Sequence, residues 1–129
     1  MIGALFIFSH SGELLISRIY RDNDVSSSDA TIFRANVIYA NREVKHPVNH
    51  VEIDNVSFFH IKRGDLWICA VSRSNANAAM VFEFLDRFAH TMESYFGKMD
   101  EESVKNNFIL LYELLDDQTR AREDHVSGD

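Results

Sequence analysis

Apolar residues recur at helical spacing between residues 74 and 97, and this segment carries the most regular pattern in the chain. At about 100° per residue, its apolar side chains fall on one arc of roughly 160° and its charged side chains take the other side. Ser74 or Asn75 can cap the helix start, and Gly97 tolerates the left-handed backbone of a helix end. The pattern therefore predicts an amphipathic helix that rests on an apolar layer. The apolar arc holds Ala78, Val81, Phe82, Phe84, Leu85, Phe88, Ala89, Met92, Tyr95 and Phe96.

A second helix is predicted over residues 100–115, where three carboxylates stand at the end that the helix dipole makes favourable for negative charge. Leu110 and Leu114 lie on a different face from the expected core stripe. Because a helix that rests on one sheet cannot bury both faces, Leu110 and Leu114 are candidates for a partner surface. The carboxylates are Asp100, Glu101 and Glu102, and the core stripe is Val104, Phe108, Leu111, Tyr112 and Leu115.

A third helical pattern begins at the polar residues 27–29 and runs to about Val44, and Pro47 follows its end. Its core stripe is expected to face the sheet. A second apolar stripe lies roughly 120° or more away, where a helix on one sheet leaves side chains in water. This second stripe is the first candidate for a partner surface. The core stripe is Phe33, Val37, Ala40 and Val44, and the second stripe is Ile32, Ala35 and Tyr39.

Five segments have the composition of strands. The first and the last are apolar on both faces, so they are expected side by side at the centre of a sheet that is covered above and below. The pattern predicts an α+β domain with a five-stranded, mostly antiparallel sheet of order 2-1-5-4-3, with the first helix on one face and the last two on the other. The domain is expected to span residues 1–116, followed by a polar tail, 117–129, that frays. The strands are Ile2–Ser9, Glu13–Tyr20, Val48–Ile53, Val56–Lys62 and Leu66–Ser72.

Composition narrows the possible partners. The net charge of −7 argues against nucleic acid, because phosphate binding requires a concentrated basic surface, and it makes direct membrane binding unfavourable. Cys69 is the only cysteine and lies in an apolar run, which indicates a core residue rather than a disulfide. The apolar start is too short for a signal peptide and lacks a basic beginning, and no run approaches the ~18–20 apolar residues of a spanning helix. These features favour a cytoplasmic protein.

No group of residues in the sequence predicts catalysis, a cofactor or a metal. His46 and His50 could pair across a turn, but no third ligand is nearby. The acidic pairs Glu101–Glu102 and Asp116–Asp117 are interpreted as helix-end charges, and no glycine-rich loop is placed to hold phosphate. We therefore expect a protein that is not an enzyme.

Three short strings match known motifs and have simpler explanations. Asn55–Ser57 matches a glycosylation acceptor, but it begins a predicted strand in a chain without a secretory signal. Arg63–Asp65 matches an adhesion tripeptide, but it lies where a hairpin turn is needed. The aromatic string Ser57–His60 could stack on nucleic acid bases, but the acidic charge favours core packing.

Several longer strings are more specific than these short motifs. They are Ser57–Arg63 (SFFHIKR), Asn75–Leu85 (NANAAMVFEFL), Tyr95–Lys98, Val104–Asp116 (VKNNFILLYELLD) and, near the start, Met1–Gly3, Gly12–Arg18 and Tyr20–Asp22. These strings resemble the N-terminal domain of the medium (mu) chain of clathrin adaptor complexes. Phe58–His60 and Met80–Leu85 are most similar to the plasma-membrane (second) adaptor type. The resemblance extends from Met1 to about Asp116, and the sequence from Asp117 onward is unlike the family.

The resemblance implies a longin-like fold without catalytic residues or cofactors. It implies a structural subunit that docks on a large beta-type chain in a heterotetramer with large and small adaptor chains. Such a subunit works in endocytosis and vesicle-mediated transport, contacts clathrin only indirectly, and reaches the membrane only through the complex, at coated pits and vesicles of the plasma membrane. The family reads cargo with a C-terminal domain, which we do not find in this sequence. The alternative is a free-standing longin-type regulator that binds a small GTPase or a SNARE.

Overall fold

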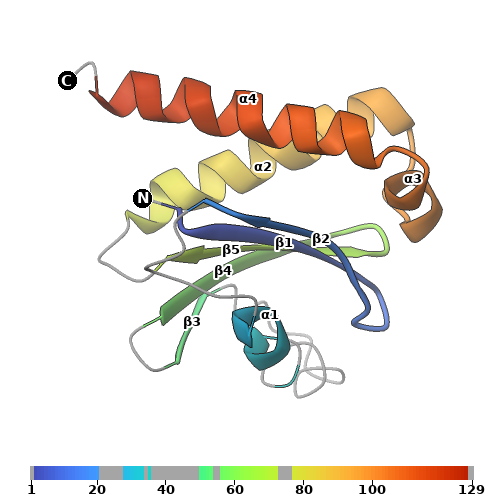
Figure 1. Cartoon of the computed structure of the whole chain (residues 1–129), viewed down its shortest axis with the longest axis horizontal. Coiled ribbons are helices and arrows are strands. Elements are labelled where there is room, and N and C mark those ends of the chain that lie inside the picture. The colour runs from blue at the N-terminus through green and yellow to red at the C-terminus, as the bar shows by residue number, and fades with distance from the viewer. Residues whose placement is uncertain are drawn as a thin grey trace.

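The structure is a computed structural model that describes residues 2–20, 28–33, 35, 50–53, 56–72 and 77–127. In residues 28–29, 50–53 and 118–127 only the backbone is described. The chain forms an open antiparallel sheet with helices on both of its faces (Figure 1). This arrangement confirms the expected α+β class.

The strands lie in the order β2-β1-β5-β4-β3, and each neighbouring pair is antiparallel. β1 and β5, the two strands with apolar side chains on both faces, pair directly with each other, from Ala4 opposite Val71 to Ser9 opposite Leu66. All six side chains of β1 are buried. The strands are β1 (Ala4–Ser9), β2 (Leu14–Ile19), β3 (His50–Ile53), β4 (Val56–Arg63) and β5 (Leu66–Ser72).

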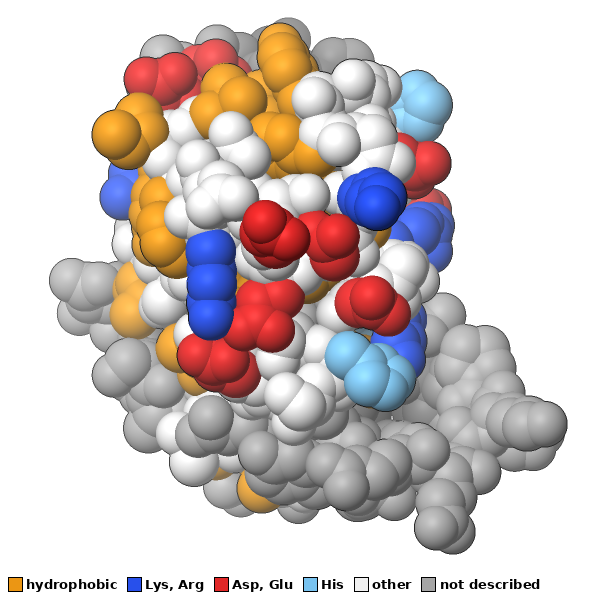
Figure 2. Space-filling model, turned by 90° about the vertical axis from the view of Figure 1, so that its right-hand side faces the viewer, with side chains coloured by type: hydrophobic (Ala, Val, Ile, Leu, Met, Phe, Trp, Pro, Cys, Tyr) orange, Lys and Arg blue, Asp and Glu red, His pale blue; other side chains and the backbone are white. Residues whose placement is uncertain are grey.

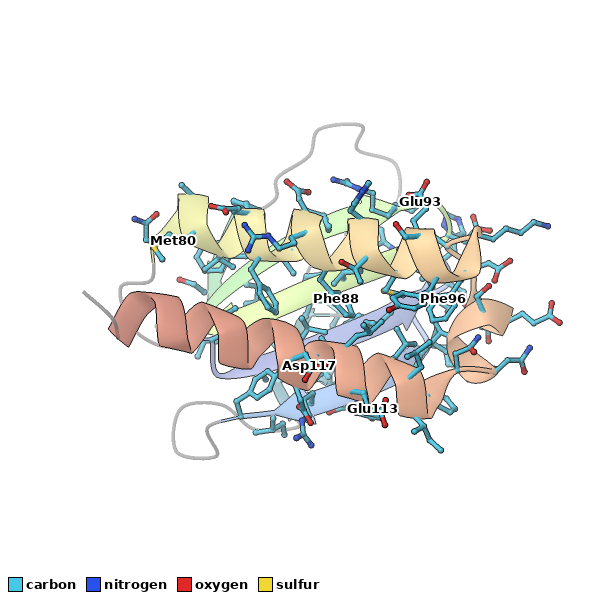
Figure 3. All side chains as sticks on the ribbon, turned by 90° about the horizontal axis from the view of Figure 1, so that it is seen from above. Met80, Phe88, Glu93, Phe96, Glu113 and Asp117 are labelled. Atoms are coloured by element: carbon cyan, nitrogen blue, oxygen red, sulfur yellow. The ribbon has the colours of Figure 1, made fainter. Side chains whose placement is uncertain are left out.

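The helices are distributed unevenly over the two faces of the sheet. α2 and α4 lie side by side on one face, α3 joins them at one end, and α1 lies on the opposite face (Figure 1). Seen from above, Phe88 of α2 lies between α2 and α4 over the sheet (Figure 3). The helices are α1 (Ser28–Phe33), α2 (Ala78–Phe96), α3 (Glu101–Lys105) and α4 (Phe108–Ser127).

The sheet separates two hydrophobic clusters because successive side chains of a strand point to opposite faces. On the side of α2, α3 and α4, the cluster includes Leu5, Ile7 and Ile68. On the side of α1, it includes Phe6 and Phe8 of β1 and is largely aromatic. Cys69 belongs to this second cluster, is fully buried and is a free thiol, as its apolar surroundings in the sequence predicted.

α2 follows its predicted pattern except at its two ends. The cap is Asn77, whose Oδ1 accepts a hydrogen bond from the Met80 N–H at 3.2 Å, so the expectation of Ser74 or Asn75 is wrong. At the other end, Gly97 has φ 74° and donates its N–H to the Glu93 carbonyl. Tyr95 was expected in the core but is 61% exposed. It lies in the last turn of the helix, and periodicity alone does not reveal where the layer beneath a helix ends.

The single helix predicted over residues 100–115 is in fact two helices, α3 and α4, with a break at Asn106 and Asn107. The Asn107 side-chain amide donates to the Ser103 carbonyl at 2.8 Å, the kind of local hydrogen bond by which asparagine competes with a continuing helix. The predicted end near Leu115 is also wrong, because α4 continues to Ser127. Residues 117–123 contain good helix formers, so the loss of the apolar pattern there does not end the helix.

Candidate partner-binding surface

Large apolar side chains reach the surface at the start of α4. Phe108 is 39% exposed and Ile109 is 79% exposed, and with the half-buried Leu110 they form what we call the α4 surface. The surface borders an open hollow of about 530 Å³. The hollow is lined by Lys105, Asn106, Asn107, Phe108, Ile109, Leu110 and Glu113.

The phase of α4 explains why Ile109 faces outward. α4 is anchored in the helix-side cluster by Leu111 and Leu115, both fully buried. Ile109 lies two residues before Leu111, which places it roughly 160° away around the helix. Phe108 has the helical spacing of Leu111 and Leu115, but it is the first residue of α4 and is 39% exposed, so the core position predicted for it is wrong.

Two side-chain contacts hold α4 against the edge strand β2. The Arg18 guanidinium donates to both carboxylate oxygens of Asp116, at 3.0 and 3.1 Å. The Tyr112 hydroxyl donates to the Ser17 carbonyl at 3.3 Å. Asp116 was interpreted as a solubilising charge at a helix end, but it lies within α4 and forms this ion pair. The α4 surface is therefore presented from a helix that is fixed to the sheet.

One basic and one acidic side chain line the hollow beside the α4 surface, Lys105 and Glu113. Lys105 pairs with Glu101 at 2.7 Å and lies 3.9 Å from Glu13. The hydrogen bond to Glu101 raises the pKa of Lys105, and the same bond lowers the pKa of the Glu101 carboxyl. Among the described side chains, Glu113 has no ion-pair partner. Its carboxylate is thus the unpaired charge beside the surface, and Glu113 projects from the side of α4 that faces away from α2 (Figure 3).

Figure 2 faces the end of the molecule where α3 lies. Hydrophobic side chains gather in its upper part, above a band of acidic and basic side chains. The carboxylates at the start of α3 act as the sequence predicted. Asp100 caps α3 by accepting a hydrogen bond from the Ser103 N–H at 2.9 Å, and this bond lowers the pKa of the Asp100 carboxyl.

The candidate partner residues from the sequence are found in different environments. Ile32 is half-buried and packs against the α1-side cluster, and Ala35 is exposed. Tyr39 lies outside the described residues. Leu110 belongs to the α4 surface, whereas Leu114 is half-buried against the helix-side cluster. The sequence analysis missed Phe108 and Ile109. The helical spacing of Ile109 from Leu111 was the signal that could have revealed Ile109.

The short motif matches have structural roles where they are described. Gly64 has φ 57° in the turn between β4 and β5, and the neighbouring Asp65 N–H donates to the Met99 carbonyl at 2.9 Å. Phe58 and Phe59 are buried in the two clusters, 0% and 2% exposed, so they are core residues rather than a stacking platform. The structure does not describe Asn55, His46 or the side chain of His50.

In the part of the chain that the structure describes, no helix combines the length and apolar character needed to cross a membrane.

Comparison with known proteins gives one family and several relatives. The family model for the clathrin adaptor complex small chain matches residues 1–122. The AP-2 complex subunit mu of Caenorhabditis elegans is 62% identical over 117 residues, and that of Dictyostelium discoideum is 50% identical over 117 residues. The AP-1 complex subunit mu of Dictyostelium discoideum is 33% identical over 114 residues. The two AP-2 alignments cover 91% of this chain and 26% of each relative, and the AP-1 alignment covers 88% of this chain and 26% of the relative. The chain thus spans about a quarter of the length of these curated relatives.

Proposed function

Because the chain belongs to the clathrin adaptor complex small chain family, we propose that it is a structural subunit module of a clathrin adaptor complex in vesicle-mediated transport and endocytosis. The observation that carries the proposal is the match over residues 1–122, together with 62% identity to an adaptor mu subunit. The resemblance to the N-terminal domain of adaptor medium chains, predicted from the sequence, is confirmed by these relatives. The role we propose is assembly rather than catalysis.

The proposed partner is a large beta-type adaptor chain, and the proposed contact is the α4 surface. Permanent subunit interfaces are large and more hydrophobic than transient ones. Phe108 and Ile109 supply exposed apolar area, and the Arg18–Asp116 pair keeps the helix that carries them in place. The unpaired carboxylate of Glu113 beside this surface favours a partner surface with an apolar centre and a basic residue next to it.

The second proposed contact is the second apolar stripe predicted from the sequence, Ile32, Ala35 and Tyr39. Ala35 is exposed and Ile32 is half-buried, so part of this stripe is accessible. Tyr39 remains a candidate on the basis of its helical spacing alone.

We also propose a detailed architecture for the fold. We assign a longin-like five-stranded sheet of order 2-1-5-4-3, with α1 on one face and α2 on the other, where the predicted last helix is divided into α3 and α4. We propose that the module spans residues 1–116, and in the polar segment 117–129 that follows, α4 continues as far as Ser127. The pairing of β3 with β4, from His50 opposite Phe59 to Ile53 opposite Val56, supports the fifth strand. The two hydrophobic clusters, one on each face, support helices on both sides.

Assembly implies a location and further partners. In the proposal, the chain is cytoplasmic, joins large and small adaptor chains, and reaches the plasma membrane at coated pits only as part of the complex. The relatives named above are complex subunits by name. They do not favour the alternative of a free-standing longin-type regulator for a small GTPase or a SNARE.

Co-purification from cells tests the proposal. A tagged full chain is expected to bring down adaptor large and small chains in comparable amounts. A matched preparation with Ile109→Asp, which puts a charge on the α4 surface, is expected to bring down much less. A wild-type chain that is recovered as a monomer without any large chain would contradict the proposal.

A further inference from the structure

The α1 side of the sheet contains a buried histidine packed among aromatic rings. His60 lies on β4, is 4% exposed, and is paired with Cys69 of β5. The centre of its ring lies 5.2 Å from the centre of the Phe33 ring, with 65° between the ring planes. The centre of the Trp67 ring lies 5.9 Å away. Phe33 is fully buried and comes from α1, so α1 covers the imidazole.

The packing around His60 suits a neutral ring. Among the described residues, neither Nδ1 of His60 nor Nε1 of Trp67 has a hydrogen-bond partner. A neutral imidazole has one donor nitrogen and one acceptor nitrogen, whereas a protonated imidazole has two donors. Burying a charged ring with an unpaired donor is costly. Protonation of His60 therefore disfavours the closed packing.

Among the side chains that the structure describes, the groups that face His60 do not compensate a positive charge. On β4, Lys62 follows on the same face, and its Nζ lies 5.1 Å from the Trp67 ring centre and 2.9 Å from Nδ1 of His10. On β5, the Cys69 thiol is directed to the Ala70 carbonyl. The described side chains of α1, residues 30–33, are uncharged, and burial is the cause that lowers the pKa of His60. Lys62 adds a like charge rather than a counter-charge.

We propose that His60 makes the seating of α1 on the sheet sensitive to acid, because the ring accepts a proton more readily once α1 has moved away. The consequence is confined to one face of the sheet. Movement of α1 uncovers an aromatic surface that includes Phe8, Phe58 and Trp67. It also displaces Ile32, which belongs to the second proposed contact, while the separate helix-side cluster stays intact.

The sign and size of the effect follow from linkage. Burial lowers the pKa of His60 from 6.5 to about 4 in the closed form. The form with α1 packed on the sheet is therefore most stable above the ordinary histidine pKa. Its stability relative to the open form decreases as the pH falls toward the lowered pKa of about 4. Between about pH 7.5 and about pH 5, the ratio of open to closed molecules is expected to rise about 30-fold.

Trp67 reports on the opening, because it is the only tryptophan in the chain and its ring contacts His60. The experiment uses the full chain and measures acrylamide quenching of Trp67 fluorescence between about pH 7.5 and about pH 5, together with hydrogen exchange of α1 and α2. After correction for the intrinsic pH dependence of exchange, opening at α1 is expected to increase about 30-fold and α2 to stay protected. Unchanged quenching and unchanged α1 protection would overturn the proposal.

Variants assign the effect to this one histidine. His60→Phe keeps an aromatic ring and removes the titratable group, so its quenching is expected to be independent of pH over the same range. His60→Gln, a neutral side chain of similar length, serves if the first variant does not fold. His90→Gln is the matched control, because His90 is exposed on α2, and it should keep the wild-type response. A pH response that persists in the folded His60 variant would contradict the proposal.

Discussion

α2 and α4 lie on the same face of the sheet and are nearly equal in length, yet they meet the solvent in different ways. The outward positions of α2 are polar throughout most of its length, and Glu83 and Arg87 pair with each other at 2.6 Å. The first turn of α4 instead exposes Phe108 and Ile109. A helix with a charged outer side completes a surface in water, whereas consecutive exposed apolar residues indicate a surface that a partner covers.

The two helices are also fixed to the molecule differently. α2 has a side-chain cap at its start and a continuous row of buried residues from Val81 to Met92. α4 begins after a break and buries Leu111 and Leu115. Its Asp116 forms an ion pair with Arg18 of the edge strand β2. The difference shows that α2 serves mainly the core, while α4 combines a core side with an exposed apolar start.

The largest expected effect compares one phenylalanine from each helix. Phe88 of α2 is fully buried, so Phe88→Ala should lower the free energy of unfolding by about 3–5 kcal/mol. Phe108 of α4 is 39% exposed, so Phe108→Ala should cost less than about 1.5 kcal/mol. Urea unfolding of both variants measures the difference. Equal losses would show that the start of α4 belongs to the core after all.

A smaller effect is expected from the ion pair that holds α4. The side chains of Arg18 and Asp116 are 42% and 35% exposed, so solvent screens the pair and Asp116→Asn should cost about 0.5–1 kcal/mol. The matched variant in α2, Glu83→Gln, removes an i,i+4 pair and should cost about 0.3–0.5 kcal/mol. Both differences should shrink at high salt. A larger loss for Glu83→Gln would contradict the expectation that the pair between α4 and β2 contributes more to stability than the pair within α2.

The smallest expected effect on stability is at Ile109. Because this side chain is 79% exposed, Ile109→Gln should change the free energy of unfolding by less than about 0.5 kcal/mol. Thermal and urea unfolding of the isolated chain measure it. A loss similar to that of a buried isoleucine would mean that Ile109 packs inside the fold.

Much of the architecture was predictable because local patterns determine it. The apolar runs of β1 and β5 require cover on both faces, and the strand Leu66–Ser72 was predicted with its observed bounds. The buried row of α2 follows directly from its periodicity. Alternation and helical periodicity are short-range properties, and a single sequence displays them.

The candidate site was predicted only in part. Phe108 has the helical spacing of the core residues Leu111 and Leu115, but it is the first residue of α4 and is 39% exposed, and periodicity does not show where the layer beneath a helix ends. The ion pair between Arg18 and Asp116 joins residues 98 positions apart, and no local pattern indicates it. Leu110 was identified from the sequence, because it is an apolar residue outside the core stripe of its helix. Ile109 was not identified, although it is the most exposed of the large apolar side chains described.

Affinity for a purified large beta-type adaptor chain tests the account most directly. Binding of the wild-type chain is compared with Ile109→Asp, which charges the α4 surface, and with His90→Asp, which adds the same group at an exposed position of α2. Interface centres commonly contribute about 2 kcal/mol or more per residue, so Ile109→Asp should weaken binding by roughly 30-fold while His90→Asp should leave it unchanged. Equal affinity of the two folded variants would contradict the account.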